Sequence, residues 1–261
     1  AGDANTSNTL VALGYEAATD NTGGAYNTGI GWQALQRNTT GQYNTTLGYR
    51  AGKLISTGVQ NVAIGSEALD ATTTGSNNVA VGHTTLGANT NGQRNVAIGN
   101  HALDSNIGGS YNVGIGHNAL TVGSTSNYNT AIGYEALSNN TGVGANVAVG
   151  SGAMRANTTG QSNVAVGYNA LDANTTAHNN TAVGQDALGA NQSGGDNTAV
   201  GHSALKTNVS GTANVAVGNT ALQANTGSSN TAVGHAALSS NTGSQNVAIG
   251  RGSLATQTGS S

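Results

Sequence analysis

Side chains able to bind metals or transfer protons are few in this chain, and their spacing keeps them apart. Among its 261 residues are six histidines, ten acidic residues and no cysteine. Four histidines occupy the same place in a repeated phrase, but never in adjacent repeats: His83, His117, His202 and His235. Zinc requires ligands about 2 Å from one ion, so we expect no single-chain zinc site from this column. His101 and His178 occupy other positions of the repeat.

The acidic residues are equally dispersed. Glu67 and Asp70 lie near one corner of the repeat, but no other repeat contains this pair. A general acid and a general base must both reach one substrate, so an isolated pair is weak support for catalysis. No serine or threonine has a histidine and an acid at a recurring spacing. We therefore expect no catalytic residue, no bound metal and no cofactor, in a chain that is not an enzyme.

The aromatic residues are the more suggestive group, because all nine fall at two positions of the repeat. One set directly follows a recurring glycine: Tyr15, Trp32, Tyr49, Tyr134 and Tyr168. The other directly precedes a recurring asparagine: Tyr26, Tyr43, Tyr111 and Tyr128. The rings could simply cover an exposed edge and stack along it, or they could form an edge that binds glycans or a surface. The candidate contact residues are Tyr15, Tyr26, Trp32, Tyr43 and Tyr49, which form the densest group, with Tyr134 and Tyr168 further along.

The element that positions these side chains is a five-residue phrase, such as NVAIG at Asn61–Gly65 and NVAVG at Asn78–Gly82. It occurs fifteen times, and the spacing between successive closing glycines is seventeen in twelve intervals and sixteen in the last two. So strict a period indicates one supersecondary unit stacked on itself. We expect a single solenoid domain over residues 1–261, with 17-residue coils over 1–218 and 16-residue coils over 219–261.

The pattern within the repeat favours parallel β-coils over helices. The residue before the closing glycine is Val, Ile or Leu in all fifteen copies, and the residue three before it is always Val or Thr. β-Branched residues suit strands, whereas a single leucine in each repeat gives no helical stripe. Each repeat is predicted to form a strand, a corner, a short extended Ala-Leu segment and a second corner. The shorter intervals lose one residue between Asn225 and Asn230, which places the deletion in that second corner.

Stacking of identical coils predicts ladders of identical side chains, about 4.8 Å apart. The expected structural ladder comprises asparagines, glycines and aliphatic residues: Asn61, Asn78, Asn95, Gly65, Gly82, Gly99, Ile64, Val81, Leu69 and Leu103. Stacked asparagine amides can pass hydrogen bonds from coil to coil and hold the corner backbone in place.

Alternation along the strand puts Val62 and Ile64 on one face and Ala63 and Gly65 on the other. We expect the larger side chains to form the core. Such a narrow core barely offsets the ordering cost of about 1–2 kcal/mol per residue. Alanine and glycine are poor strand formers, so we expect the face of small residues to be a lateral contact between neighbouring rolls.

The composition excludes several classes of protein. Seven Lys and Arg residues, with a net charge of −3, form no basic stripe for nucleic acid. No apolar run approaches the ~20 residues of a membrane-spanning helix, so we expect no membrane insertion. Low charge combined with a regular Val/Ile column argues against disorder. The first residues, Ala1 and Gly2, include no initiator methionine, so we expect a processed chain or an excerpt of a longer one.

The NVAIG phrase followed by Ala-Leu resembles the head repeat of trimeric autotransporter adhesins. With the added corner Asn157–Gly160 (NTTG), it also resembles repeats of bacteriophage tail fibres and related trimeric fibre adhesins. The resemblance extends from about Asn8 to Gly250. It implies a left-handed parallel β-roll with three chains around one axis. The adhesin heads commonly have a shorter repeat, and this chain contains no membrane-anchor domain, stalk heptads or self-cleaving chaperone.

We therefore expect a structural and adhesive fibre segment, located outside the cell, on a cell surface or on a virion. Its expected partners are copies of itself, as a homotrimer or an end-to-end polymer, and a cell-surface glycan or protein receptor. The alternatives are a self-assembling extracellular filament subunit and an ice-binding solenoid. Ice binding is less well supported because Val interrupts the Thr column in nine of fifteen copies. An enzyme on a β-solenoid would need acids converging on adjacent coils.

Overall fold

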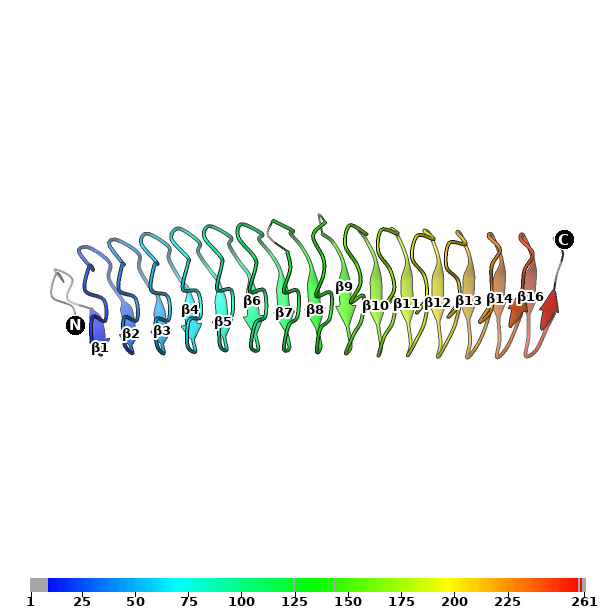
Figure 1. Cartoon of the computed structure of the whole chain (residues 1–261), viewed down its shortest axis with the longest axis horizontal. Helices are drawn as coiled ribbons and strands as arrows, with labels where there is room; N and C mark the ends of the chain where they lie inside the picture. The colour runs from blue at the N-terminus through cyan, green and yellow to red at the C-terminus, as the bar shows by residue number, and fades with distance from the viewer. Residues whose placement is uncertain (1–8, 124, 143, 258, 260–261) are drawn as a thin grey trace. The chain divides into compact units, whose positions relative to one another are not determined.

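The computed structural model of the chain describes residues 9–123, 125–142, 144–257 and 259. Two compact units are present, Ala1–Asn129 and Thr130–Ser261. Across the described residues there is no helix, and every regular element is a short β-strand (Figure 1). The predicted all-β parallel solenoid, with its ~17-residue spacing, is therefore confirmed.

The described residues of the first unit form seven parallel strands in chain order. They are β1 (Leu10–Leu13), β2 (Asn27–Ile30), β3 (Thr45–Leu47), β4 (Val62–Ile64), β5 (Val79–Val81), β6 (Val96–Ile98) and β7 (Val113–Ile115). Each pairs with the next in the register of the repeat, so that Val62 lies opposite Val79 and Ile64 opposite Val81. Figure 1 shows one such strand in each coil.

The second unit repeats this arrangement. Its strands are β8 (Thr130–Ile132), β9 (Val147–Val149), β10 (Val164–Val166), β11 (Thr181–Val183), β12 (Thr198–Val200), β13 (Val215–Val217), β14 (Thr231–Val233), β15 (Ser240–Asn241), β16 (Val247–Ile249) and β17 (Thr256–Gln257). Strands β8 to β14 and β16 form the main parallel sheet of this unit. Strands β15 and β17 form a separate two-stranded pair, in which Ser240 lies opposite Thr256.

The strand faces are opposite to those predicted from the sequence. Ala63 is fully buried, whereas Val62 and Ile64 are half-buried on the outer face. The same pattern recurs in β5, where Ala80 is the buried residue. The expectation that Ile64 and Val81 form the core and that alanine forms an outward lateral contact was therefore wrong.

The narrow cross-section of the coil explains why the small residue points inward. At Gly114, which replaces the alanine in β7, an added Cβ would lie 3.1 Å from Leu103 Cδ1 and 3.3 Å from the carbonyl oxygen of Ala119. Both residues lie in turns that follow a strand. In coils with leucine at this turn only glycine or alanine occupies the inward strand position, and the larger Thr46 is buried there in the coil where Gly52 replaces the leucine. The larger residues on either side of this position therefore face outward.

The segment that follows the strand is a turn, not the short extended stretch predicted. In the coil of β4, Glu67 has φ 58° and Leu69 has φ 53°, both in the left-handed region. Leu69 and Leu103 are nevertheless fully buried, as predicted for the ladder. Backbone bonds between coils hold the turn, as when the Leu69 N–H donates to the Thr85 carbonyl over 3.0 Å.

The predicted asparagine ladder is present and lies inside the coil. Asn61, Asn78 and Asn95 are fully buried. The backbone N–H of Asn78 donates to Asn61 Oδ1 over 3.0 Å, and its Nδ2 donates to the carbonyl of Gly92 over 2.9 Å. Each asparagine side chain therefore forms two hydrogen bonds with the following coil. One is with the backbone N–H where the strand begins, and the other is with a carbonyl of the corner just before it.

The closing glycines are required by both conformation and space. Gly65 has φ +131°, and a Cβ there would lie 2.3 Å from the carbonyl oxygen of Gly82. Gly82 and Gly99 show the same conformation, with φ +140° and +126°. A side chain at these positions would push successive coils apart.

The two short coils confirm that the deletion falls in the corner. Strands β13, β14 and β16 have three residues each, as do β3 to β12. Val215 of β13 pairs with Thr231 of β14, and Thr231 pairs with Val247 of β16, so the parallel register continues across the deletion. A second asparagine column lies seven residues after the closing glycine, as Asn225 does after Gly218. Loss of one corner residue brings this column next to the first, and Asn230 Nδ2 donates to Asn225 Oδ1 over 3.2 Å.

Candidate functional site

The N-terminal aromatic residues form two stacked ladders beside the strand face. At the end of β1, β2 and β3, the rings of Tyr15 and Trp32 stack with centroids 6.0 Å apart, and those of Trp32 and Tyr49 at 5.0 Å. Before β2 and β3, Tyr26 and Tyr43 stack at 4.9 Å with an interplanar angle of 6°. All five side chains are exposed. The structure thus brings the densest group of predicted contact residues together.

This stacking limits what the ladders can bind. The faces of Trp32 are directed at Tyr15 and Tyr49, so a sugar ring cannot lie flat on them without separating the stack. The ring edges and the tyrosine hydroxyls remain accessible. A hydrogen bond to Glu16, together with its negative charge, raises the pKa of the Tyr15 hydroxyl. The hydroxyl therefore remains a donor at neutral pH.

The other two predicted contact residues are separated by one coil. Tyr134 and Tyr168 follow closing glycines two coils apart in the second unit, and Ser151 occupies the same position between them. Both side chains are exposed. A hydrogen bond to Glu135 raises the pKa of Tyr134. At two coils apart, the two rings are too distant to stack on each other.

A third aromatic pair was not among the predicted contact residues. Tyr111 and Tyr128 stack at 5.1 Å with an interplanar angle of 12°. The guanidinium of Arg94 lies 5.3 Å from the Tyr111 ring centroid and donates to the Tyr111 hydroxyl. All three residues precede a ladder asparagine, so the repeat position was the signal that could have identified them.

Three histidines meet on one corner, which the sequence did not predict. The ring centroid of His101 lies 5.5 Å from that of His83 and 6.1 Å from that of His117, in edge contacts. His101 occupies the position beside theirs, in the coil between them, and its Nδ1 bonds with Thr84 Oγ1 at 2.7 Å. Within the described ranges, no group of three potential ligands is placed to hold a metal ion.

Most charged side chains lie along the turn that follows the strand. Arg50 contacts Glu67 and Asp70, each at 2.9 Å. The two acids that form an isolated pair in the sequence thus share one cation. Burial is the main cause that raises the pKa of Asp70, while Arg50 opposes it. The arrangement stabilises the stack of coils and gives neither acid an open partner for proton transfer.

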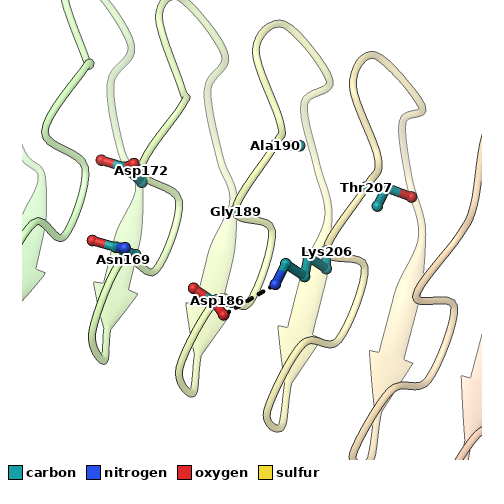
Figure 2. Close-up of a pocket in the computed structure, with 7 residues that line it drawn as sticks. All are labelled: Asn169, Asp172, Asp186, Gly189, Ala190, Lys206 and Thr207. Carbon is teal, nitrogen blue, oxygen red and sulfur yellow. Dashed lines mark hydrogen bonds and ion pairs between the residues drawn. The ribbon is translucent and has the colours of Figure 1, made fainter.

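The same turn in the second unit contains an open groove (Figure 2). Its volume is about 250 Å³, and its lining residues are Asn169, Asp172, Asp186, Gly189, Ala190, Lys206 and Thr207. Lys206 Nζ lies 3.2 Å from Asp186 Oδ2. No residue of this groove was predicted as a site from the sequence.

No protein-family model matches the chain, and no curated protein matches its sequence. In the part of the chain that the structure describes, no helix has both the length and the apolar character needed to cross a bilayer.

Proposed function

We propose that the chain is a structural and adhesive segment of an extracellular fibre, on a bacterial surface or a virion, built from three copies of a left-handed roll. The observation that carries the proposal is the outer strand face. In both units it consists of two columns of Val, Ile, Leu and Thr with no charged residue. The resemblance of the repeat to trimeric fibre adhesins supports the same assembly.

The outer strand face has the properties of a contact between copies. Ile98 in β6 and Val217 in β13 expose more than a third of their surface, as does Leu47 in β3. Continuous apolar surface of this kind is unusual on a monomer. Burial of apolar area contributes roughly 25 cal/mol per Å², which supplements the thin interior of each roll. The lateral contact is therefore assigned to the β-branched columns, in place of the alanine column.

The aromatic ladders flank this face and supply the adhesive role. Tyr26 and Tyr43 precede β2 and β3, whereas Trp32 and Tyr49 follow them. Their edges and hydroxyls are available to a glycan or a protein receptor on another surface. Aromatic residues with one polar atom are common in such contacts because they combine apolar area with a hydrogen bond.

The solution mass of the chain tests the assembly. Three copies are expected, with a shift to one copy in Ile98→Lys and Val217→Lys, because a buried lysine at the contact is unpaired. Gln93→Lys adds the same charge to an exposed corner and should leave the mass unchanged. A monomeric wild-type chain would contradict the trimer, and an open polymer would favour the filament subunit. Thermal hysteresis would favour ice binding.

A further inference from the structure

The groove at Gly189 exists because one coil lacks a side chain that its neighbours have. The equivalent position of the turn is Asp172 in the coil before, Gly189 in this coil and Lys206 in the coil after. Figure 2 shows Gly189 lying between these two neighbours. The missing side chain leaves the space of about 250 Å³.

A second glycine at the same position shows that a missing side chain alone does not make a groove. An added Cβ at Gly87 in the first unit would lie 2.8 Å from Asp104 Oδ1, so the neighbouring carboxylate already fills the gap. At Gly189 the nearest atom would be the backbone oxygen of Asp186, at 3.3 Å. The gap stays open there because Lys206 contacts Asp186 at 3.2 Å.

The charged side chains around the groove are engaged in ion pairs. Arg155 Nη2 contacts Asp172 Oδ2 at 3.2 Å, and Lys206 contacts Asp186 at 3.2 Å. Burial is the largest cause that raises the pKa of Asp172, and Arg155 opposes this rise. Both acids of the groove contact a cation, and Arg155 also contacts Glu135 at 3.8 Å. A neutral ligand leaves these ion pairs in place, whereas a charged ligand would compete with Asp172, Asp186 or Lys206 for a partner.

The lining combines hydrogen-bonding side chains with a stretch of backbone that has almost no side chain. Asn169 and Thr207 contribute an amide and a hydroxyl, and Lys206 and Asp186 contribute a donor and an acceptor. Gly189 and Ala190 contribute backbone and one methyl group. This pattern suits a ligand with hydroxyls around its rim and C–H groups on one face. The volume is below the ~300–1,000 Å³ of pockets for drug-sized ligands, which restricts the ligand to about one ring.

We propose that the groove binds a single neutral, hydroxyl-rich sugar residue of a surface glycan. The inference rests on the proposed adhesive function and names the class of receptor that the second unit recognises. It assigns this role to a site separate from the aromatic ladders, which belong to the first unit. The sugar ring lies over Gly189 and Ala190, and its hydroxyls bond to Asn169, Asp186 and Lys206.

Filling the groove tests the proposal. Gly189 does not have a left-handed φ, and an added Cβ would lie 3.3 Å from the Asp186 carbonyl oxygen, so Gly189→Val needs only a small shift of that carbonyl while its side chain occupies the binding space. The probe is a set of neutral hexoses (glucose, galactose and mannose), and the measurement is saturation-transfer NMR on the intact chain. We expect transfer to at least one hexose in the wild type, loss of it in Gly189→Val, and retention in Gln223→Val. Gln223 lies at the same position of another coil.

A second variant separates binding from folding. Lys206→Ala leaves Asp186 without its cation and should weaken the transfer signal. Lys206→Arg keeps a cation at this position and should retain the signal. Absence of transfer to any of the three hexoses, or equal transfer in wild type and Gly189→Val, would overturn the proposal. Neither result affects the fibre assembly, because that is measured by the mass shift in Ile98→Lys and Val217→Lys. A monomeric chain that still binds hexose through Gly189 would contradict the assembly alone.

Discussion

Asn38, in the second asparagine column, has a buried side-chain oxygen without a hydrogen-bond partner among the described residues. Ile55 occupies the same position in the next coil, where an asparagine would continue the column. Where the second asparagine column is continuous, that oxygen accepts a bond, as when Asn157 Nδ2 donates to Asn140 Oδ1 over 2.8 Å. The same break recurs at Asn106, whose oxygen is also unpaired and whose next position is Gly123. The hydrogen bonding of each asparagine in this column therefore depends on the residue at the same position in the next coil.

Restoring the ladder at Ile55 should stabilise the first unit. Ile55 fills space that the leucine column leaves empty, because that position is Gly52 and a Cβ there would lie 2.7 Å from Thr46 Cγ2. The triple variant Thr46→Ala, Gly52→Leu, Ile55→Asn reproduces the common coil. An unsatisfied buried polar group costs about 1–3 kcal/mol, so we expect a similar gain in unfolding free energy. Denaturant unfolding measures it, and Ile55→Asn alone should destabilise. A less stable triple variant would contradict the explanation.

Substitution of a closing glycine should be far more damaging than substitution of a corner glycine. Gly65→Ala forces a side chain onto φ +131° and against the Gly82 carbonyl. Backbone strain alone costs about 1–3 kcal/mol, and the separation of two coils adds to it. Gly23 is the control, because its Cβ would meet only Thr40 Cγ2 at 3.8 Å. Gly23→Ala should be neutral or slightly stabilising. Hydrogen exchange of the β4 and β5 amides measures the local effect. Equal protection in both variants would refute the close-contact argument.

The adhesive role of the stacked rings predicts loss of binding without loss of fold. Trp32→Ala and Tyr49→Ala remove exposed rings and leave the interior unchanged. Cell or glycan-surface adhesion should therefore fall, while the circular dichroism spectrum and thermal unfolding stay close to those of the wild type. Gln93→Ala, at an exposed residue that is not among the predicted contact residues, is the control and should leave adhesion unchanged. Unchanged adhesion after both substitutions would remove the aromatic edge from the proposed function.

The raised pKa of Asp172 predicts a pH dependence of stability. Burial favours the protonated carboxyl in the folded chain, so the folded state binds more protons than the unfolded state just above the ordinary aspartate pKa. The unfolding free energy contributed by this group therefore decreases as pH rises through that window. Asp172→Asn cannot titrate, and its unfolding free energy should decrease less over the same range. Urea unfolding at several values between about pH 4 and 6 measures this. A steeper decrease of the unfolding free energy in Asp172→Asn than in the wild type would contradict the predicted contribution of Asp172.

Periodicity predicted the stacking well but could not assign the inner face. The register of the coils, the asparagine ladder and the corner deletion follow from repeat spacing, which sequence displays directly. Alternation shows that Val62 and Ile64 share a face, yet it does not say which face is inside. Hydrophobicity favoured the wrong one, because the deciding factor is the short distance from strand to leucine layer. That distance depends on the turn, where Glu67 and Leu69 adopt left-handed conformations. Neither residue type favours this conformation, so the sequence did not indicate it.

The candidate sites were predictable to a smaller degree. Repeat position identified the aromatic columns, because residues one repeat apart stack whatever their type. It did not reveal that the rings cover one another's faces, nor that His101 lies between His83 and His117. The groove at Gly189 depends on which neighbour Lys206 contacts, and such a choice between side-chain conformations leaves no mark in the repeat pattern.

The shortened corner between Asn225 and Asn230 has a consequence for grafting. The amides on either side stay in register with their neighbours although one residue is missing. The bend can therefore change in length without loss of register between coils. Foreign peptides inserted there in successive coils would be displayed as an evenly spaced array, one strand separation of about 4.8 Å apart. The coil spacing would fix the distance between the inserted peptides, while their sequences could be chosen freely.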